Sequence, residues 1–385
     1  MPWYVDRSRI QAYHDCKRLR FLNFHWGGPG LERKTLGLPL LNGQQLHNGL
    51  AGLLTGGRVD EIVTLVGDDY RRIVDERGVL VEDPQAIEFL IAEQLALLEG
   101  LLRAWQRVRL PVVLDEYDVV SVELEQPWAI QGTDIIDMVR CDAVLRRKSD
   151  KVLFYLEFKS VSNPSDGWAQ QWEHNSQLLA NVRALETIYR EPVGGVLIEG
   201  IVKGRRAVDK AMMSPFRGSI IQQSPITYGY KSRDYQTGAF HYDLVWSKSA
   251  DKFATWEEMS MEKWLDHFTP ADLEALFIPL PPIKPVLRDM ERWERQTLAQ
   301  ERMVRDDVAE IARIVEGVAY GAHTIDDVEH ALDARFPQNT NHCHRYFGHP
   351  CAFAHICFNQ QVSDDPIGSG LYIARRPHHD IEPTE

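Results

Sequence analysis

Consecutive strand-like segments near the middle of this 385-residue chain constrain its fold more than any other feature. Residues 119–130, 135–147 and 151–161 are rich in valine, isoleucine and aromatic side chains, as β-strands are. A helical segment follows at about 167–187, and then comes the apolar run 193–204. This order of strands and helix predicts a mixed sheet flanked by helices, an α/β or α+β core.

The remainder of the chain is mostly helical in pattern. Residues 6–24 and 83–107 carry apolar side chains at helical spacing, and residues 255–335 do so around a proline-rich interruption. Residues 207–250 show no clear period and are expected to be irregular. The predicted parts are an N-terminal helical region (1–115), the core (116–250), a C-terminal helical region (251–365) and a tail (366–385).

Composition narrows the setting in which the protein works. The net charge of −13 argues against a nucleic-acid partner unless a local basic groove lies on the acidic body. The sequence shows no signal-like segment and no apolar stretch of transmembrane length, so we expect a soluble, cytoplasmic protein without a membrane partner. The five cysteines are an odd number, which argues against a disulfide framework.

Acidic and basic residues interrupt the apolar strand 151–161. Glu157 and Lys159 are two residues apart, so their side chains share one face of the strand. A hairpin turning at 146–151 would bring Asp142 beside Glu157. Adjacent carboxylates repel each other, and Mg²⁺ or Mn²⁺, which take oxygen ligands, would relieve that repulsion and activate a water. Lys159 would then assist this water, whereas the structural alternative is a lysine that merely neutralises two acids.

The segments VRCDAVL and FYLEFKS together resemble the D…(D/E)xK signature of the PD-(D/E)xK nucleases, whose fold is restriction-endonuclease-like. The resemblance is closer to the RecB-like branch, which includes CRISPR-associated and phage exonucleases with an iron–sulfur cluster. In that branch a histidine from an upstream helix joins the metal ligands, and the segment GQQLHNGL offers His47. The metal ligands that the resemblance implies are His47, Asp142, Glu157 and the carbonyl group of Phe158.

The resemblance extends to the helix that follows the lysine strand. The branch often has Q-x-x-x-Y there, and WEHNSQLLAN offers Gln177, with Asn181 in the place of the tyrosine. By this resemblance Gln177 acts beside Lys159 in the catalytic site, while the tyrosine has no counterpart. Val139 departs from a frequent glycine, but Arg140 agrees with a frequent basic residue and would contact DNA.

Three of the cysteines crowd into the segment NHCHRYFGHPCAFAHIC near the C-terminus. Thiolates favour iron–sulfur clusters or Zn²⁺. One early cysteine and three late ones resemble the cluster-bearing RecB-like nucleases and imply a [4Fe–4S] cluster bound by Cys16, Cys343, Cys351 and Cys357. Zinc is the alternative, because histidines among the cysteines could replace a thiolate. These histidines are His342, His344, His349 and His355. Cys141 is expected to be a small buried hydrophobe.

Taken together, the two motifs favour a metal-dependent DNA nuclease. The resemblance implies an exonuclease that acts on single-stranded DNA or on DNA with free ends. The settings that the resemblance implies are repair, recombination, phage or CRISPR DNA processing in bacteria, archaea or their viruses, with protein partners in such a complex. Two alternatives stay open. One is a nuclease fold kept for DNA binding without catalysis, and the other is a zinc-stabilised assembly protein.

Overall fold

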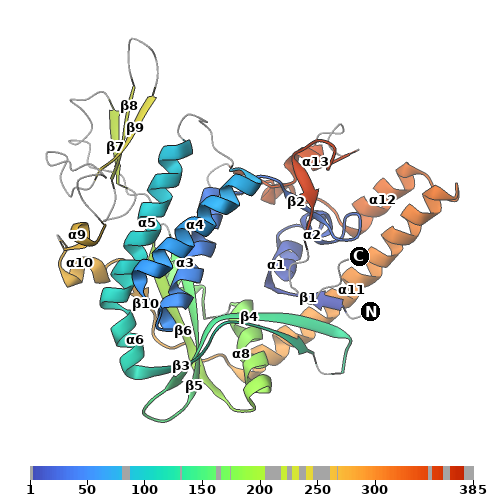
Figure 1. Ribbon diagram of the computed structural model, residues 1–385. Coiled ribbons are helices and arrows are strands. Elements are labelled where there is room, and N and C mark those ends of the chain that lie inside the picture. Colours follow the sequence, from blue (N-terminus) through green and yellow to red (C-terminus); the bar gives the residue numbers. More distant parts are fainter. Residues whose placement is uncertain are drawn as a thin grey trace.

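A computed structural model gives the arrangement of most of the chain (Figure 1). It describes residues 3–79, 87–130, 132–161, 166–173, 175–203, 218–222, 228–233, 240–245, 261–266, 268–345, 349–358 and 365–376. The architecture is mixed α/β, with a mixed sheet flanked by helices, as the order of strands and helices predicted.

The central sheet has six strands. They are β1 (Trp3–Val5), β3 (Tyr117–Ala129), β4 (Ile135–Arg147), β5 (Leu153–Val161), β6 (Val193–Val202) and β10 (Phe277–Pro279). β3 and β4 form a long antiparallel hairpin, β5 runs antiparallel to β4, and β6 runs parallel to β5. The strand order predicted from residues 119–204 is therefore present, with short β1 and β10 added to it.

Strand β4 is shared between partners in a way that creates a fork. β3 follows one edge of β4 along nearly its whole length. On the other edge, β5 pairs with residues 143–146 and β1 pairs with residues 135–137. No described strand pairs with residues 138–142 on that edge. β4 and β5 therefore diverge next to the pair Ala143↔Leu156, and Asp142 is the first residue of β4 beyond that pair.

Each face of the sheet packs against its own helices, because side chains alternate along β5. Phe154, Leu156 and Phe158 join the apolar core formed by the helices that precede the sheet in sequence. Leu153 and Tyr155 join a second core on the opposite face. The first set of helices is α3 (Leu38–Leu54), α4 (Val59–Arg77), α5 (Ile87–Val108) and α6 (Leu110–Glu116), and the second is α8 (Ser176–Tyr189) with the first part of α11 (Leu287–Ala319).

The two ends of the chain meet away from the sheet and share a third apolar core (Figure 1). The fully buried Arg20 pairs with the fully buried Glu301 at 2.8 Å, which fastens the N-terminal segment to α11. The elements gathered here are α1 (Arg7–Asp15), α2 (Lys17–Phe24), β2 (Leu31–Arg33), α12 (Ile325–Arg335), η3 (Thr340–His342), β11 (His344–Arg345), β12 (His349–Pro350), α13 (Ala354–Phe358) and β13 (Tyr372–Ala374).

Parts of the sequence prediction are wrong. Residues 6–24 are not one helix, because Cys16 is extended (φ −165°, ψ 121°) and separates α1 from α2. The segment 167–187 is likewise divided into α7 (Asp166–Gln170) and α8. Residues 207–250 are not wholly irregular, because β7 (Gly218–Gln222), β8 (Tyr228–Arg233) and β9 (Phe240–Val245) pair as an antiparallel sheet.

Two short helices, α9 (Met261–Leu265) and α10 (Pro270–Glu274), precede β10. Their apolar side chains, among them Leu265 and Leu273, extend the core around α5. Among the described residues, none of the helices has both the length and the apolar character that crossing a membrane requires.

Candidate metal centre

The fork between β4 and β5 holds the carboxylate of Asp142, which is 7 % exposed. Its Oδ2 atom accepts the backbone N–H of Phe158 at 2.7 Å. Its Oδ1 atom lies 3.0 Å from Nδ1 of His47, which projects from α3. The ring of Phe158 packs edge-on against the His47 ring, with the ring centroids 6.1 Å apart. Asp142 therefore links a helix on one face of the sheet to the backbone of the lysine strand.

Glu157, Lys159 and Gln177 form a second group at the same fork. The ammonium of Lys159 contacts Oε1 of Glu157, and Nε2 of Gln177 donates to that same oxygen at 3.0 Å. Lys159 also donates to Oε1 of Gln177, at 3.3 Å. The other carboxylate oxygen of Glu157, Oε2, is buried and has no hydrogen-bond partner. Because an unpaired buried oxygen is costly, this site is suited to binding a cation.

The ionisable groups at the fork shift one another's pKa values. Burial and then the charge of Asp142 raise the pKa of Glu157. Burial alone would raise the pKa of Asp142, but His47 and Lys159 outweigh burial and lower it. Burial alone would lower the pKa of His47, yet Asp142 outweighs burial and raises it. The two carboxylates thus repel each other across the fork, and a divalent cation would relieve that repulsion.

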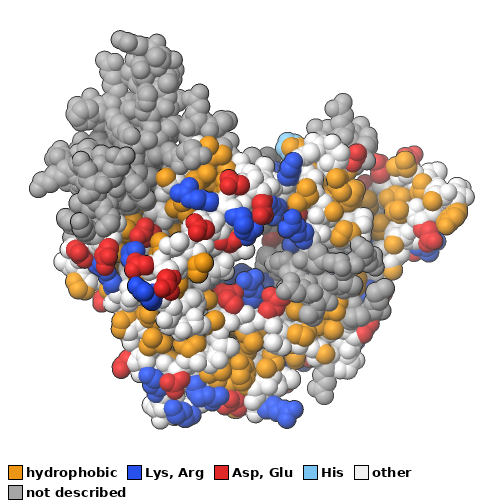
Figure 2. Space-filling model, viewed as in Figure 1, with side chains coloured by type: hydrophobic (Ala, Val, Ile, Leu, Met, Phe, Trp, Pro, Cys, Tyr) orange, Lys and Arg blue, Asp and Glu red, His pale blue; other side chains and the backbone are white. Residues whose placement is uncertain are grey.

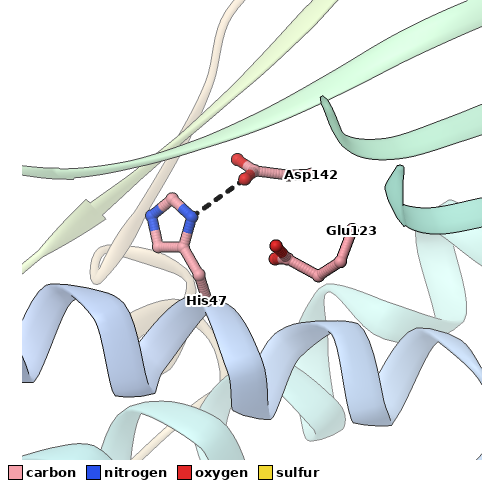
Figure 3. Close-up of side chains that lie close together, drawn as sticks. All are labelled: His47, Glu123 and Asp142. Atoms are coloured by element: carbon pink, nitrogen blue, oxygen red, sulfur yellow. Dashed lines mark hydrogen bonds and ion pairs between the residues drawn. The ribbon is translucent and has the colours of Figure 1, made fainter. Parts of the chain in front are cut away.

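Glu123, on β3, belongs to this site although the sequence analysis did not select it. One ligand atom from each of His47, Glu123 and Asp142 lies within 4.8 Å of the others (Figure 3). Leu124 pairs with Cys141, so the hairpin register places Glu123 opposite Asp142. Counting outward from the turn near residue 132 could have suggested this pairing from the sequence. The direction of the side chain could not have been found that way, because it depends on an unusual backbone angle.

The oxygen and nitrogen donors at the fork fit a hard divalent cation such as Mg²⁺ or Mn²⁺. His47, Glu123 and Asp142 converge there, whereas Glu157 does not meet the same 4.8 Å spacing with them. Oε1 of Glu123, like Oε2 of Glu157, is buried without a hydrogen-bond partner. Phe158 enters the site through its N–H and its ring. Its carbonyl group as a ligand stays a prediction.

The surroundings of the fork leave room for a larger ligand. A cavity of about 260 Å³ is lined by Gln177, Arg140 and Arg7, among others, and a second cavity of about 960 Å³ shares Ile10 and Trp293 with it. Figure 2 shows acidic and basic side chains gathered around a hollow near the middle of the face in view. The hollow carries both signs of charge, whereas the DNA hypothesis predicts a basic groove around the metal site.

Two further residues from the motif comparison lie beside the fork. Arg140 pairs with Oε2 of Glu123 through Nη2 at 2.8 Å and Nε at 3.2 Å, and more than half of its side chain is exposed. Asn181 is buried on α8, and its Nδ2 atom donates to the carbonyl of Arg140 and to the hydroxyl of Tyr155. A tyrosine hydroxyl is therefore present near this position, but it comes from β5 instead of α8.

The cysteines named by the motif lie in another place. Cys16, Cys343, Cys351 and Cys357 line one small cavity together with His342. The extended residue Cys16 accepts the N–H of Asn339 at 3.3 Å. Burial raises the pKa of the Cys343 thiol and raises that of Cys357 to about 11. Among the described residues, no three of these sulfur atoms meet the 4.8 Å spacing found for the His47 group.

The remaining candidate thiolate substitutes and Cys141 are also accounted for. His355 is exposed, and the side chains of His344 and His349 lie outside the described part of the chain. Cys141 is fully buried in the core on the α8 face, as a small hydrophobe would be.

Comparison of the chain with protein-family models and with curated proteins finds no match.

Proposed function

We propose that this chain is a divalent-cation-dependent DNA nuclease with a restriction-endonuclease-like fold, of the RecB-like branch of the PD-(D/E)xK superfamily. The observation that carries the proposal is the convergence of Asp142, Glu157 and Lys159 at the fork of two strands, with Gln177 bonded to both Glu157 and Lys159. Buried acids with unpaired oxygens beside a fixed ammonium group suit phosphoryl chemistry better than a purely structural role.

A Mg²⁺ or Mn²⁺ ion would be held by His47, Asp142, Glu157 and the carbonyl of Phe158, and it would polarise the phosphodiester and the attacking water. The protein itself contributes a positioned positive charge. Lys159 is tied to Glu157 and Gln177, so its ammonium keeps one place as negative charge develops on the phosphate. Gln177 bridges these two residues from the start of α8 and fixes the helix relative to the lysine strand.

Two cavities that share Ile10 and Trp293 give the proposed site an extended lining, which suits a polymeric substrate. The basic residues of this lining include Arg140, Lys284 and Arg292, and they alternate with acids such as Asp137 and Asp289. Basic side chains at intervals can contact successive phosphates, even on a protein of net negative charge. DNA with a free end, cleaved as by an exonuclease, is the substrate that we propose.

The four cysteines are proposed to hold a [4Fe–4S] cluster that joins α1 and α2 to the C-terminal segment. The support for this proposal is that all four cysteines line one small cavity, although they come from opposite parts of the sequence. Thiolates are ligands that iron–sulfur clusters and Zn²⁺ both accept, so the metal itself has to be measured. Protein purified under nitrogen should be brown and contain iron. A colourless protein with stoichiometric zinc would support the zinc-stabilised alternative instead.

The nuclease proposal is tested by digesting end-labelled single-stranded and double-stranded DNA with Mg²⁺ or Mn²⁺, with a chelator control. Lys159→Ala is expected to lower the rate by about 10²–10³-fold. Lys34→Ala, which changes an exposed lysine, is the matched control and should retain full activity. Equal rates for wild type and Lys159→Ala would overturn the catalytic assignment.

A further inference from the structure

We propose that Glu123 is a cation ligand and that it completes a second cation position, with His47 and Asp142, beside the one formed by Asp142 and Glu157. When two ions are bound, His47 would belong to this second position and Asp142 would be shared between the two. The inference builds on the proposed nuclease function, but cation binding can be measured without DNA. It arises from the order of the strands. Glu123, Asp142 and Glu157 lie on β3, β4 and β5, which are adjacent, so Asp142 stands between two other carboxylates.

Each outer carboxylate of this row has one oxygen that the protein does not satisfy. Oε1 of Glu123 and Oε2 of Glu157 are both buried and have no hydrogen-bond partner. The companion oxygens are occupied, by Arg140 in one case and by Lys159 and Gln177 in the other. A single row of three acids with an open oxygen at each end provides for a cation on either side of Asp142.

The backbone of Glu123 supports a specific role for its side chain. Its φ angle is +43°, in the left-handed region that residues other than glycine rarely adopt. The pairs Val122↔Ala143 and Leu124↔Cys141 hold the strand in register on both sides, so the strained residue is fixed between them. Strain of this kind costs about 1–3 kcal/mol and concentrates at functional sites. Its carboxylate points toward His47 and Asp142, which come from α3 and β4 (Figure 3).

Arg140 gives this position a counter-ion that a cation can replace. Its guanidinium pairs with Glu123 while most of the side chain stays in solvent, so the pair can separate at little cost. A cation bound by Glu123 would compete with Arg140 and release it. The released guanidinium would then be free to contact a phosphate of the substrate, which couples cation loading to DNA binding.

The test is Mn²⁺ binding to the full-length protein without DNA, followed by calorimetry and by the electron paramagnetic resonance of free Mn²⁺. Wild type is expected to bind two ions per chain, whereas Glu123→Gln and Glu157→Gln should each lose one. Glu125→Gln, an exposed acid on the same strand, is the matched control and should bind two. Circular dichroism confirms that each variant is folded.

A Mn²⁺-binding isotherm of Glu123→Gln that superimposes on the wild-type isotherm would contradict this inference. If Glu157→Gln still lost an ion in that case, the nuclease proposal would stand, whereas a wild type that binds no Mn²⁺ would overturn both. Arg140→Gln gives a second measure that does not depend on changing the acid. It removes the competing charge, so the second ion should bind several-fold more tightly, and an unchanged affinity would contradict the exchange of partners.

Discussion

The carboxylate fork and the cysteine cavity are built in opposite ways. The fork lies on adjacent strands of the central sheet, with helices packed on both faces. The cavity lies where the two ends of the chain meet and is bounded by short elements such as η3 and α13. At the fork, charged groups pair with one another, as Asp142 does with His47. In the cavity, by contrast, burial raises the pKa values of the Cys343 and Cys357 thiols.

This contrast predicts that the fork keeps its shape without a metal, whereas the cysteine cavity would depend on the cluster that we propose. Hydrogen bonds and ion pairs hold the fork together, so losing a cation there should abolish activity and leave the fold intact. Thiols that must lose protons to bind a metal gain their stabilisation only when the metal is present. The predictions below probe that difference, from the largest expected effect to the smallest.

The largest effect on stability is expected from Cys16→Ser. This change removes a proposed cluster ligand between α1 and α2, and the protein should lose its iron and melt more than about 10 °C lower, because metal binding contributes directly to folding. Asp142→Asn should abolish DNA cleavage with a much smaller shift in melting temperature. Metal analysis with thermal unfolding measures both. Cys141→Ala, which changes a buried cysteine of the other core, should keep the metal. Equal melting temperatures for Cys16→Ser and Asp142→Asn would show that the cysteine cavity depends on a metal for its stability no more than the fork does.

The next effect is expected from Glu301→Gln, which acts on the chain-end region without touching a cysteine. The substitution leaves the buried charge of Arg20 without its partner and weakens the acceptor of the Trp3 indole N–H. Removing one member of a buried pair costs about 3–5 kcal/mol, to be measured by urea unfolding. Glu310→Gln breaks an exposed pair with Arg313 on the same helix and should change nothing measurable. Similar free energies of unfolding for the two variants would show that the buried ion pair does not stabilise the protein.

A smaller effect, with a defined pH dependence, is expected at Lys203, beside the fork. A β-carbon at Gly43, one turn before His47, would lie 3.4 Å from the ammonium of Lys203. Burial lowers the pKa of this lysine from 10.5 to about 8. Below pH 8 the folded and unfolded chains both hold the proton, so the full cost of burying the charge is present. Between pH 8 and 10.5 the folded chain releases its proton first, and that cost disappears.

Lys203→Met should therefore stabilise the protein at pH 7, by about 2–3 kcal/mol after allowance for the partial exposure of the side chain. The gain should vanish near pH 10.5, where wild type no longer carries the penalty. Urea unfolding of both proteins at pH 7 and pH 10 measures this difference. A gain that is the same at both pH values would mean that packing, and not charge, is responsible.

The sequence predicted those parts of the fork that follow from local periodicity. Alternation along β5 places Glu157 and Lys159 on one face, and a hairpin brings Asp142 to them; both arrangements are present. The helical position of His47 and the place of Gln177 after the lysine strand came from the motif, and the structure brings them to the same fork.

The remaining features depend on contacts between distant segments. The left-handed backbone of Glu123 arises within a hairpin held by many cross-strand pairs, and no local pattern marks it. The break at Cys16 interrupts a sequence with helical spacing, and the extended residue gains contacts with Asn339, more than 300 positions away. Tertiary contacts of this kind override local propensity, which is why one helix was expected over residues 6–24.

The smallest effect is expected at Asn181, where the motif has tyrosine. Its amide donates to the carbonyl of Arg140 at 2.9 Å and to the hydroxyl of Tyr155 at 2.8 Å, so it connects α8 to both strands of the fork. Asn181→Ala leaves the buried hydroxyl of Tyr155 and the carbonyl of Arg140 without this donor and should cost about 1–2 kcal/mol. Gln177 lies one turn away on α8, so DNA cleavage should slow by several-fold, with Mn²⁺ binding unchanged.

A double-mutant cycle with Tyr155→Phe separates positioning from general destabilisation at this point. If Asn181 acts through the tyrosine hydroxyl, the two substitutions together should cost less than the sum of the single ones, with a coupling of about 0.5–1 kcal/mol. The turnover number should follow the same non-additive pattern. Strictly additive losses in stability and rate would mean that the asparagine supports only the Arg140 backbone. The fork would then owe its geometry to the strands alone, in sharper contrast with a cysteine cavity whose stability we propose to depend on a bound cluster.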